Sequence, residues 1–204
     1  MFSASIRDRV GQVAIAGLYV FLLARAIVDW FQNHRLTGLI AAIGFSLFTF
    51  FTIRRAPLQH ADRSLLARLA TATATFAPFA FRFSVARSPL PDWLTGLFSL
   101  VGTIIVWGGL LTLRRNFGLL PAVRGGVAEH GFYRIVRHPL YAGYIWLHGA
   151  LVLGYPSWWN FAVWICAEGS QLIRLRQEER ILSADDRYRA YAKRVRWRLI
   201  PGIF

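Results

Sequence analysis

Two short groups of polar residues in the second half of the sequence carry side chains that can bind charged ligands. The first is RHPLYAG, residues 137–143, which places a guanidinium, an imidazole and a phenol around a proline. Because proline favours the first helical position and keeps the preceding residue out of the helical conformation, we expect Pro139 to begin a helix just after His138. The free N–H groups of that first turn, with Arg137 and His138 beside them, would bind a carboxylate or a phosphate. The alternative is an interfacial anchor, with Tyr141 in an aromatic belt.

The second group is the acidic pair Glu178-Glu179, which follows Arg174 and Arg176 by one turn. We expect the pair at the start of a C-terminal helix, where the dipole favours negative charge, and this can be its whole role. Two carboxylates among so many arginines would also bind a cationic ligand, and the arginines would keep them ionised. Together the two groups predict a site for a zwitterionic amino acid moiety. Its carboxylate would bind at Arg137 and His138, and its ammonium group at a glutamate.

Three further residues have chemistry of their own. Glu168 lies in an apolar segment beside small residues, where it is equally suited to pair with an arginine or to form the wall of a pocket. His130 and His148 have no metal-ligand partners at useful spacing, so we predict no metal site.

The composition is that of an integral membrane protein. Of the 204 residues, 55% are hydrophobic and 17% are charged, whereas a soluble domain carries about 25% charged residues. The net charge of +14 comes mainly from arginines that lie between apolar runs. Cations in such loops set membrane orientation and contact anionic lipid, so we predict membrane lipids rather than nucleic acid as partners.

Six apolar segments are candidates for membrane spans, which need about 20 residues each. They are residues 12–31, 36–53, 65–83, 94–113, 140–154 and 158–173. The third is the weakest, because Arg68 and Arg82 bound it and Pro78 interrupts it. We therefore predict an all-α polytopic bundle of five or six spans, followed by an amphipathic C-terminal helix. Residues 1–113 would form the N-terminal transmembrane helices, and residues 114–204 the half that holds the site.

With six spans, most of the arginines fall on one side of the membrane. That side receives both termini and the site, and its cations before the tail are Arg7, Arg9, Arg54, Arg55, Arg63, Arg114, Arg115, Arg124, Arg134 and Arg137. The other side receives Arg35, Arg82 and Arg87. By the positive-inside rule, the site and both termini are expected on the cytoplasmic side.

The order of these residues resembles a known family. Gly131-x-Tyr133-x-x-Val136-Arg137-His138-Pro139-x-Tyr141-x-Gly143, then a short hairpin, then Glu178-Glu179, is similar to the isoprenylcysteine carboxyl methyltransferases and the related membrane phospholipid methyltransferases. The ending Tyr188-x-x-Tyr191, Val195 and Arg198-Leu199-Ile200-Pro201-Gly202 also fits. The resemblance covers about the last 90 residues, and the first 110 match only as a set of spans. Relatives often carry a Phe-Gly step where this chain has Ala184-Asp185-Asp186-Arg187.

The resemblance implies S-adenosyl-L-methionine as methyl donor, whose methionine moiety carries the two charges of a zwitterion. It implies that the RHPxYxG segment and the acidic pair hold this cofactor, and it leaves open which glutamate binds the ammonium group. The glycines would let the backbone approach the cofactor closely. The cofactor-binding residues expected are Gly131, Tyr133, Arg137, His138, Tyr141, Gly143, Glu178 and Glu179.

The acceptor implied by the resemblance is lipophilic. An isoprenylcysteine-type α-carboxyl is the first expectation, and a phospholipid amine is an alternative. A carboxylate would be held by Arg137, Arg174 or Arg198, whereas an amine would lose a proton to a glutamate such as Glu178. We therefore expect Arg137, Arg174 and Glu178 as catalytic residues. Two other hypotheses are a membrane ene-reductase that uses NADPH, whose relatives are longer, and a non-catalytic protein of the same fold.

Overall fold

The computed structural model of the protein describes residues 4–34, 36–54, 60–61, 64–83, 88–113, 122–123 and 127–204. These residues are helical apart from loops and one antiparallel pair of two-residue strands. The helices are α1 (Ala4–Asn33), α2 (Leu36–Arg54), α3 (Leu65–Phe76), α4 (Asp92–Leu113), α5 (Pro139–Gly154), α6 (Trp158–Leu182) and α7 (Asp186–Arg194). The short elements are the strands β1 (His60–Ala61) and β2 (Ala122–Val123), and the 3-10 turns η1 (Ala77–Ala80) and η3 (Gly131–Arg134).

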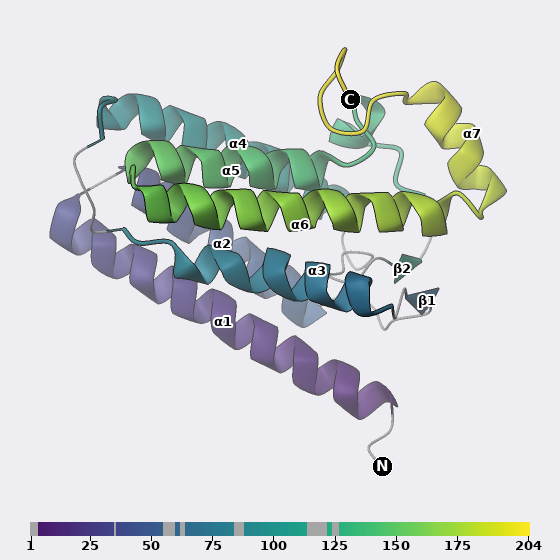
Figure 1. The fold of residues 1–204 in the computed structure, drawn as a ribbon, viewed down its shortest axis with the longest axis horizontal. Helices are drawn as coiled ribbons and strands as arrows, with labels where there is room; N and C mark the ends of the chain where they lie inside the picture. The colour runs from purple at the N-terminus through teal and green to yellow at the C-terminus, as the bar shows by residue number, and fades with distance from the viewer. Residues whose placement is uncertain are drawn as a thin grey trace.

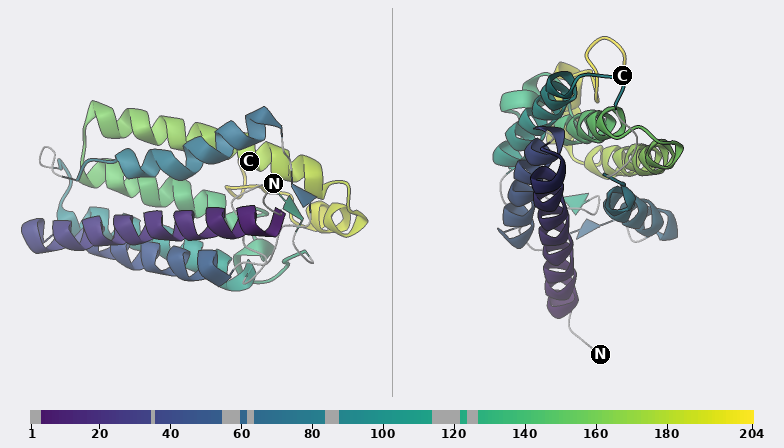
Figure 2. Two further views of the ribbon diagram at one scale, coloured as in Figure 1. Left: turned by 90° about the horizontal axis from the view of Figure 1, so that it is seen from below. Right: turned by 90° about the vertical axis from the view of Figure 1, so that its left-hand side faces the viewer.

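Helices α1 to α6 form a bundle in which consecutive helices run in opposite directions (Figure 1). This arrangement brings the start of α1, the strand pair, the start of α5, the helix α7 and the C-terminus to one end of the bundle, called here the site end. Helix α1 lies on the outside, and its N-terminal half extends away from the other helices (Figure 2). Of the arginines expected at the site end, Arg55, Arg63, Arg114, Arg115 and Arg124 lie outside the described residues.

Local sequence explains where several helices begin and end. Pro139 occupies the first turn of α5, as predicted, because its fixed backbone suits a helix start. Ser64 and Ser157 cap α3 and α6 by accepting a hydrogen bond from the backbone N–H three residues on. Pro78 ends α3 in a 3-10 turn, which agrees with its expected interruption of the third apolar segment.

Two helical segments are long and apolar enough to cross a membrane, and they are Arg9–Gln32 and Asp92–Leu113. The apolar stretch Leu65–Ala80 is shorter than a span requires. Five or six spans therefore stay a prediction. Large apolar side chains nevertheless face outward on several of the helices, including Val13 on α1, Leu69 on α3, Ile104 on α4 and Ile165 on α6, each more than half exposed.

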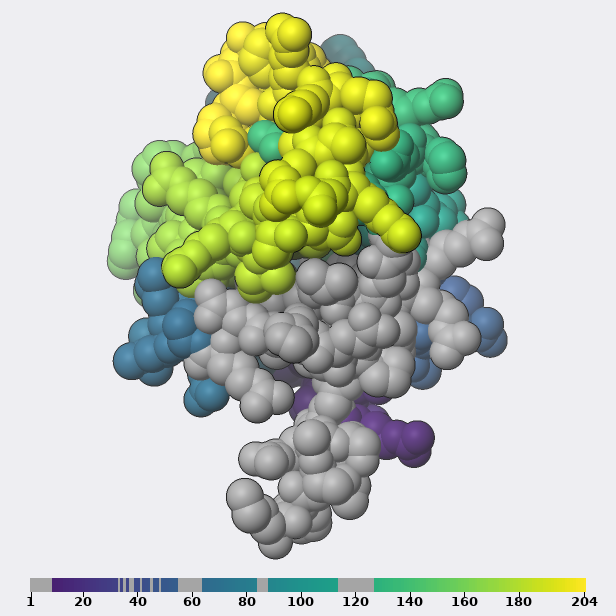
Figure 3. All heavy atoms as spheres, turned by 90° about the vertical axis from the view of Figure 1, so that its right-hand side faces the viewer, coloured from purple at the N-terminus to yellow at the C-terminus, as the bar shows by residue number. Residues whose placement is uncertain are grey.

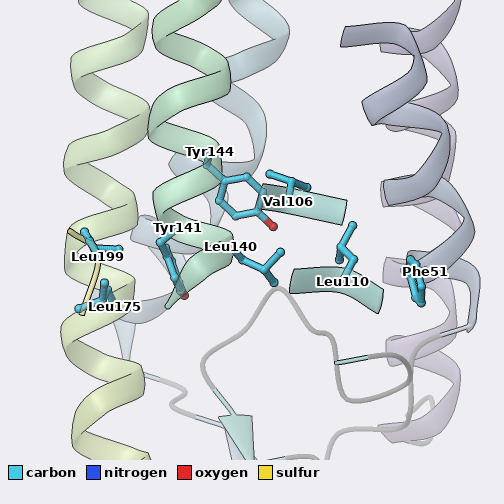
Figure 4. Packing of buried hydrophobic residues seen from close by; sticks show 8 residues of the cluster. All are labelled: Phe51, Val106, Leu110, Leu140, Tyr141, Tyr144, Leu175 and Leu199. Carbon is cyan, nitrogen blue, oxygen red and sulfur yellow. The ribbon is translucent and has the colours of Figure 1, made fainter. Parts of the chain in front are cut away.

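The core joins the two parts of the chain that the sequence suggested. One buried cluster contains Val106 and Leu110 from α4 together with Leu140 and Tyr144 from α5, and Figure 4 shows these four side chains between the two helices. A second cluster joins α1 and α2 to α5 and α6. Residues 1–113 and 114–204 therefore share one core.

The end of the bundle opposite the site is held by polar side chains that bond to other helices. Arg25 on α1 donates to the carbonyls of Phe79 and Phe81, both at 2.9 Å. Asp29 on the same helix accepts from the hydroxyl of Tyr155. The side-chain amide of Asn160 donates to the carbonyls of Arg82 and Tyr155 at 2.9 and 2.7 Å. These bonds fix the hairpin between α5 and α6, and the hairpin sets the register of the site residues.

Close packing of α4 on α5 depends on glycines. A Cβ atom at Gly143 would lie 2.6 Å from Cγ2 of Val106 and 3.0 Å from its backbone nitrogen. The close approach that Gly143 permits is therefore to α4. That Gly143 also lets the backbone approach a cofactor stays a prediction.

We expect Gly143→Ala to destabilise the protein by about 1–2 kcal/mol, because the stiff Val106 side chain and the α4 backbone have no room for the added methyl group. Gly169→Ala on α6 is the matched control, since nothing lies within 4 Å of its added Cβ. The control should be neutral or stabilising by up to ~1 kcal/mol through helix propensity. The measurement is the unfolding transition of each variant in detergent, and equal effects at the two positions would contradict the prediction.

Candidate functional site

The candidate site lies where the start of α5 meets the end of α6. His138 is the N-cap of α5 and is buried. The C-terminal tail crosses this point, because the backbone N–H of Arg137 donates to the carbonyl of Trp197 at 2.8 Å and that of His138 to the carbonyl of Arg198 at 2.9 Å. Figure 3 views this end, where the yellow tail lies beside teal residues of the preceding segment. The tail is therefore part of the site.

Glu178 and Glu179 lie near the C-terminal end of α6, so their predicted position at the start of a C-terminal helix is wrong. Helix α6 continues beyond Ile173 because Arg, Leu, Gln and Glu all favour helix. The new helix α7 begins only after Asp185, which accepts from the N–H of Arg187 at 2.8 Å. Negative charge is disfavoured at the C-terminal end of a helix. The two carboxylates must therefore be stabilised by groups outside α6.

Glu179 is stabilised by four side chains. Its Oε1 lies 2.7 Å from Nε2 of His138 and also accepts from the hydroxyl of Tyr188. Its Oε2 lies 2.9 Å from a terminal nitrogen of Arg137 and 3.2 Å from Nε of Arg198. The Glu179 side chain is 11% exposed. It connects α5, α6, α7 and the tail through one buried charge.

These contacts shift two pKa values. Burial would raise the pKa of Glu179, but the hydrogen bonds from His138 and Tyr188 and the positive charges of His138 and Arg137 lower it to about 2. Burial, followed by the hydrogen bond to Glu179, raises the pKa of Tyr188 well above its ordinary value. At neutral pH the cluster therefore holds an ionised carboxylate beside a neutral phenol.

Glu178 has a different environment. Its Oε2 accepts from the hydroxyl of Tyr141 at 2.7 Å, and the residue is only partly buried. The guanidinium of Arg174 lies over the ring of Tyr141, 5.5 Å from its centroid, and donates to Oε1 of Gln171 at 2.7 Å. Glu178 thus has one oxygen held by Tyr141, and among the described residues its second oxygen accepts no hydrogen bond that would exclude a ligand.

The remaining predicted residues lie beside this pair. Tyr133 is buried in η3, and its carbonyl accepts from the hydroxyl of Tyr191 at 2.8 Å. Burial, and next the negative charge of Glu178, raises the pKa of the Tyr133 phenol. Gly131 has a φ of +56°, which glycine adopts without strain at the turn into η3. The structure thus brings Tyr133, Arg137, His138 and Tyr141 close to the acidic pair, whereas Gly131 lies in the turn into η3 and Gly143 packs against α4. That these residues bind a cofactor stays a prediction.

Sequence reasoning missed Tyr188 as a partner of Glu179 and missed His148 as the partner of Glu168. The ring nitrogen Nδ1 of His148 lies 2.6 Å from Oε1 of Glu168. Both positions follow from the hairpin. His148 lies ten residues after His138 on α5, and Glu168 lies eleven residues before Glu179 on α6. Residues equally far from an antiparallel turn face each other, so the pairing of His138 with Glu179 would have predicted that of His148 with Glu168.

The charges of the site suit a zwitterion. Glu178 offers a carboxylate oxygen, and Nε of Arg137 is buried with no hydrogen-bond partner among the residues that the structure describes. A cation with an unused donor and a carboxylate with an unused acceptor are what the two ends of an amino acid moiety require. No protein-family model and no curated protein matches the sequence. The functional argument therefore rests on this geometry and on the resemblance of the motifs.

Proposed function

We propose that the protein is a membrane methyltransferase that uses S-adenosyl-L-methionine on a lipophilic acceptor. One observation carries the proposal. The two motifs that resemble the methyltransferases lie 35 or more residues apart in the sequence, yet their side chains meet at hydrogen-bond distance. Tyr141 bonds to Glu178, and His138 bonds to Glu179. If the two motifs only anchored the chain at the membrane surface, these side-chain contacts between them would not be expected.

The residues present fit the methionine moiety of the donor. Its ammonium group would bind to Glu178, because Glu179 is already occupied by His138, Arg137, Arg198 and Tyr188. Its carboxylate would bind at the buried Nε of Arg137. We therefore assign the cofactor contact to Glu178 and a positioning role to Glu179, which holds Arg137 and His138 in place.

When bound, S-adenosyl-L-methionine supplies an electrophilic methyl group on a sulfonium. The chain's own contribution is to orient the reactants and to exclude water, since a sulfonium leaving group needs no proton. Arg174 is buried and contacts Tyr141, which bonds to Glu178. It would therefore hold a negatively charged acceptor close to the donor.

A lipophilic acceptor follows from the surface of the bundle. Large apolar side chains face outward on α1, α3, α4 and α6, and extensive exposed apolar surface marks contact with lipid or with a partner. We propose that the six long helices lie in the membrane and that the site end faces the cytoplasm. Arg134, Arg194 and Arg196 at that end are exposed and would contact anionic headgroups.

The test is ligand binding followed by methyl transfer. The purified protein in detergent should bind S-adenosylhomocysteine saturably, and unlabelled S-adenosyl-L-methionine should compete. It should then transfer a labelled methyl group into a total lipid extract or a farnesylcysteine analogue. Label that is lost in base indicates a methyl ester, and stable label indicates an amine or ether product. Saturable binding of NADPH in place of S-adenosylhomocysteine would contradict the proposal. Binding without transfer to the lipid extract, the farnesylcysteine analogue or a lipophilic phenol would also contradict it.

A further inference from the structure

A pocket inside the bundle lies next to the candidate site, one to two helical turns deeper than Tyr141. Its enclosed volume is about 30 Å³, room for about two water molecules or for the reacting group of a larger ligand, and it opens outward, where the rest of such a ligand would lie. Its walls come from α1, α3, η1, α5 and α6, and they are partly apolar. The polar side chains that line it are Tyr19, Thr75, Tyr144, His148, Gln171 and Arg174.

The pocket is connected to the candidate site by a line of ring contacts along α5. The rings of Tyr141 and Tyr144 are 6.2 Å apart, and those of Tyr144 and His148 are 6.3 Å apart and nearly parallel. Arg174 contacts both regions, because it lines the pocket and lies over Tyr141. A reactant in the pocket would therefore adjoin a ligand held by Tyr141 and Glu178.

His148 is held in this pocket by a buried carboxylate. Its Nδ1 lies 2.6 Å from Oε1 of Glu168, and the two residues are 6% and 7% exposed. The other oxygen of Glu168 is buried, with no hydrogen-bond partner in the described part of the chain. A carboxylate at Nδ1 accepts the proton there and leaves the lone pair of Nε2 for a ligand. This is the arrangement by which a carboxylate orients a histidine to act as a base.

We propose that His148 is the general base for methyl transfer, that Glu168 positions it, and that the acceptor attacks through a weakly acidic hydroxyl group, such as a phenol, on a lipophilic molecule. The inference rests on the proposed function. The acceptor O–H bond breaks and the proton moves to Nε2 of His148. An oxygen–carbon bond then forms to the methyl group of the donor as the carbon–sulfur bond breaks, and the bonding pair stays on sulfur. His148 afterwards releases its proton to water.

The charges in the pocket select this acceptor class. A carboxylic acid is already ionised at neutral pH and needs no base. A protonated amine would be repelled by Arg174, whereas a phenolate formed beside His148 would be stabilised by it. The titratable and charged groups that face His148 are Glu168 and Arg174 on α6, Tyr144 on α5 and Tyr19 on α1. A general base must be unprotonated to accept the acceptor's proton, so the reaction rate should rise with pH.

A lipophilic nitrophenol tests the base without any methyl donor, because its absorbance reports whether it is ionised. Just below the pKa of the free dye, binding to the wild-type protein should increase the ionised fraction several-fold. His148→Gln should abolish this increase, and Glu168→Gln should reduce it and shift its pH dependence. His34→Gln and Glu129→Gln are the matched controls, since both residues lie outside the pocket, and they should behave like the wild type. The same increase in His148→Gln would overturn the proposal.

Methyl transfer then tests the role in the reaction. We expect the wild-type protein to methylate lipophilic phenols, and His148→Gln to lower the rate roughly 10²- to 10⁴-fold while S-adenosylhomocysteine binding is retained. Retained binding also shows that the variant is folded. If His148→Gln does not fold, two other measurements test whether His148 is the base. They are the methylation rate of Glu168→Gln, which should be lowered, and the pH dependence of the wild-type rate. Exclusive methylation of carboxylic acids or amines would overturn this inference and leave the proposed function intact. Absence of S-adenosylhomocysteine binding would overturn the proposed function, whatever the nitrophenol shows.

Discussion

Replacing Glu179 by Gln is expected to destabilise the protein by about 3–5 kcal/mol, because removing one partner of a buried ion pair leaves the other charges uncompensated. The charge concerned is that of Arg137, whose side chain is 9% exposed, and the ring of His138 also loses its carboxylate partner. Glu129→Gln is the matched control. Its ion pair with Arg194 lies at the surface, so its loss should cost less than about 1 kcal/mol. The free energy of unfolding can be measured for both variants in mixed detergent micelles.

The same charge makes stability depend on pH. Because the pKa of Glu179 is lowered from 4.5 to about 2 in the folded state, the unfolded chain binds a proton more readily than the folded chain. The stabilisation is therefore complete above about pH 5.5 and is lost as the pH falls from about 4.5 to about 2. The stability gap between the wild-type protein and Glu179→Gln should narrow across that window. A stability difference that is constant with pH, or that narrows above pH 6, would show that the Glu179 carboxylate does not cause the pH dependence.

The sequence predicts the helices better than it predicts how they join. The long apolar runs mark α2 and α4 to within two residues, and Pro139 marks the start of α5. These signals are local, because they depend on hydrophobic length and on backbone constraints. The end of α6 was missed because the sequence becomes polar after Ile173. Polar residues are unsuited to the membrane interior, but they do not end a helix. Helix α6 ends at its C-cap Ser183, and Asp185 caps the start of α7.

The site was only half predictable for a similar reason. The motifs named Arg137, His138, Tyr141 and the acidic pair, but the role of each glutamate depends on contacts with distant segments. Glu179 bonds to Arg198, 19 residues later, and to Tyr188 on a separate helix. Nothing in the local sequence indicates that these groups neutralise Glu179 and leave Glu178 exposed to a ligand. Tertiary packing decides between the two carboxylates.

Replacing Glu178 by Gln should weaken binding of S-adenosylhomocysteine roughly 10- to 100-fold, since a hydrogen bond to a charged group contributes about 1.5–3 kcal/mol. The substitution removes the negative charge that we assign to the ammonium group. It keeps an oxygen that can accept from the hydroxyl of Tyr141, so the fold should be retained. Glu129→Gln removes an exposed carboxylate elsewhere and should leave the affinity unchanged. Isothermal titration calorimetry in detergent measures the affinity of the wild-type protein and of both variants.

A ligand without the amino group separates direct binding from indirect effects. The deaminated analogue of S-adenosylhomocysteine should bind to the wild-type protein about as weakly as the full ligand binds to Glu178→Gln. The affinity of this analogue should fall little further when Glu178 is replaced by Gln. Removing the amino group from the ligand and removing the charge of Glu178 abolish the same interaction. Tyr141→Phe removes the hydroxyl that holds Glu178 but keeps the charge, so it should weaken binding only a few-fold. If the affinity losses caused by deamination of the ligand and by Glu178→Gln instead add in full, Glu178 does not contact the ammonium group. Another acidic residue would then have to bind it.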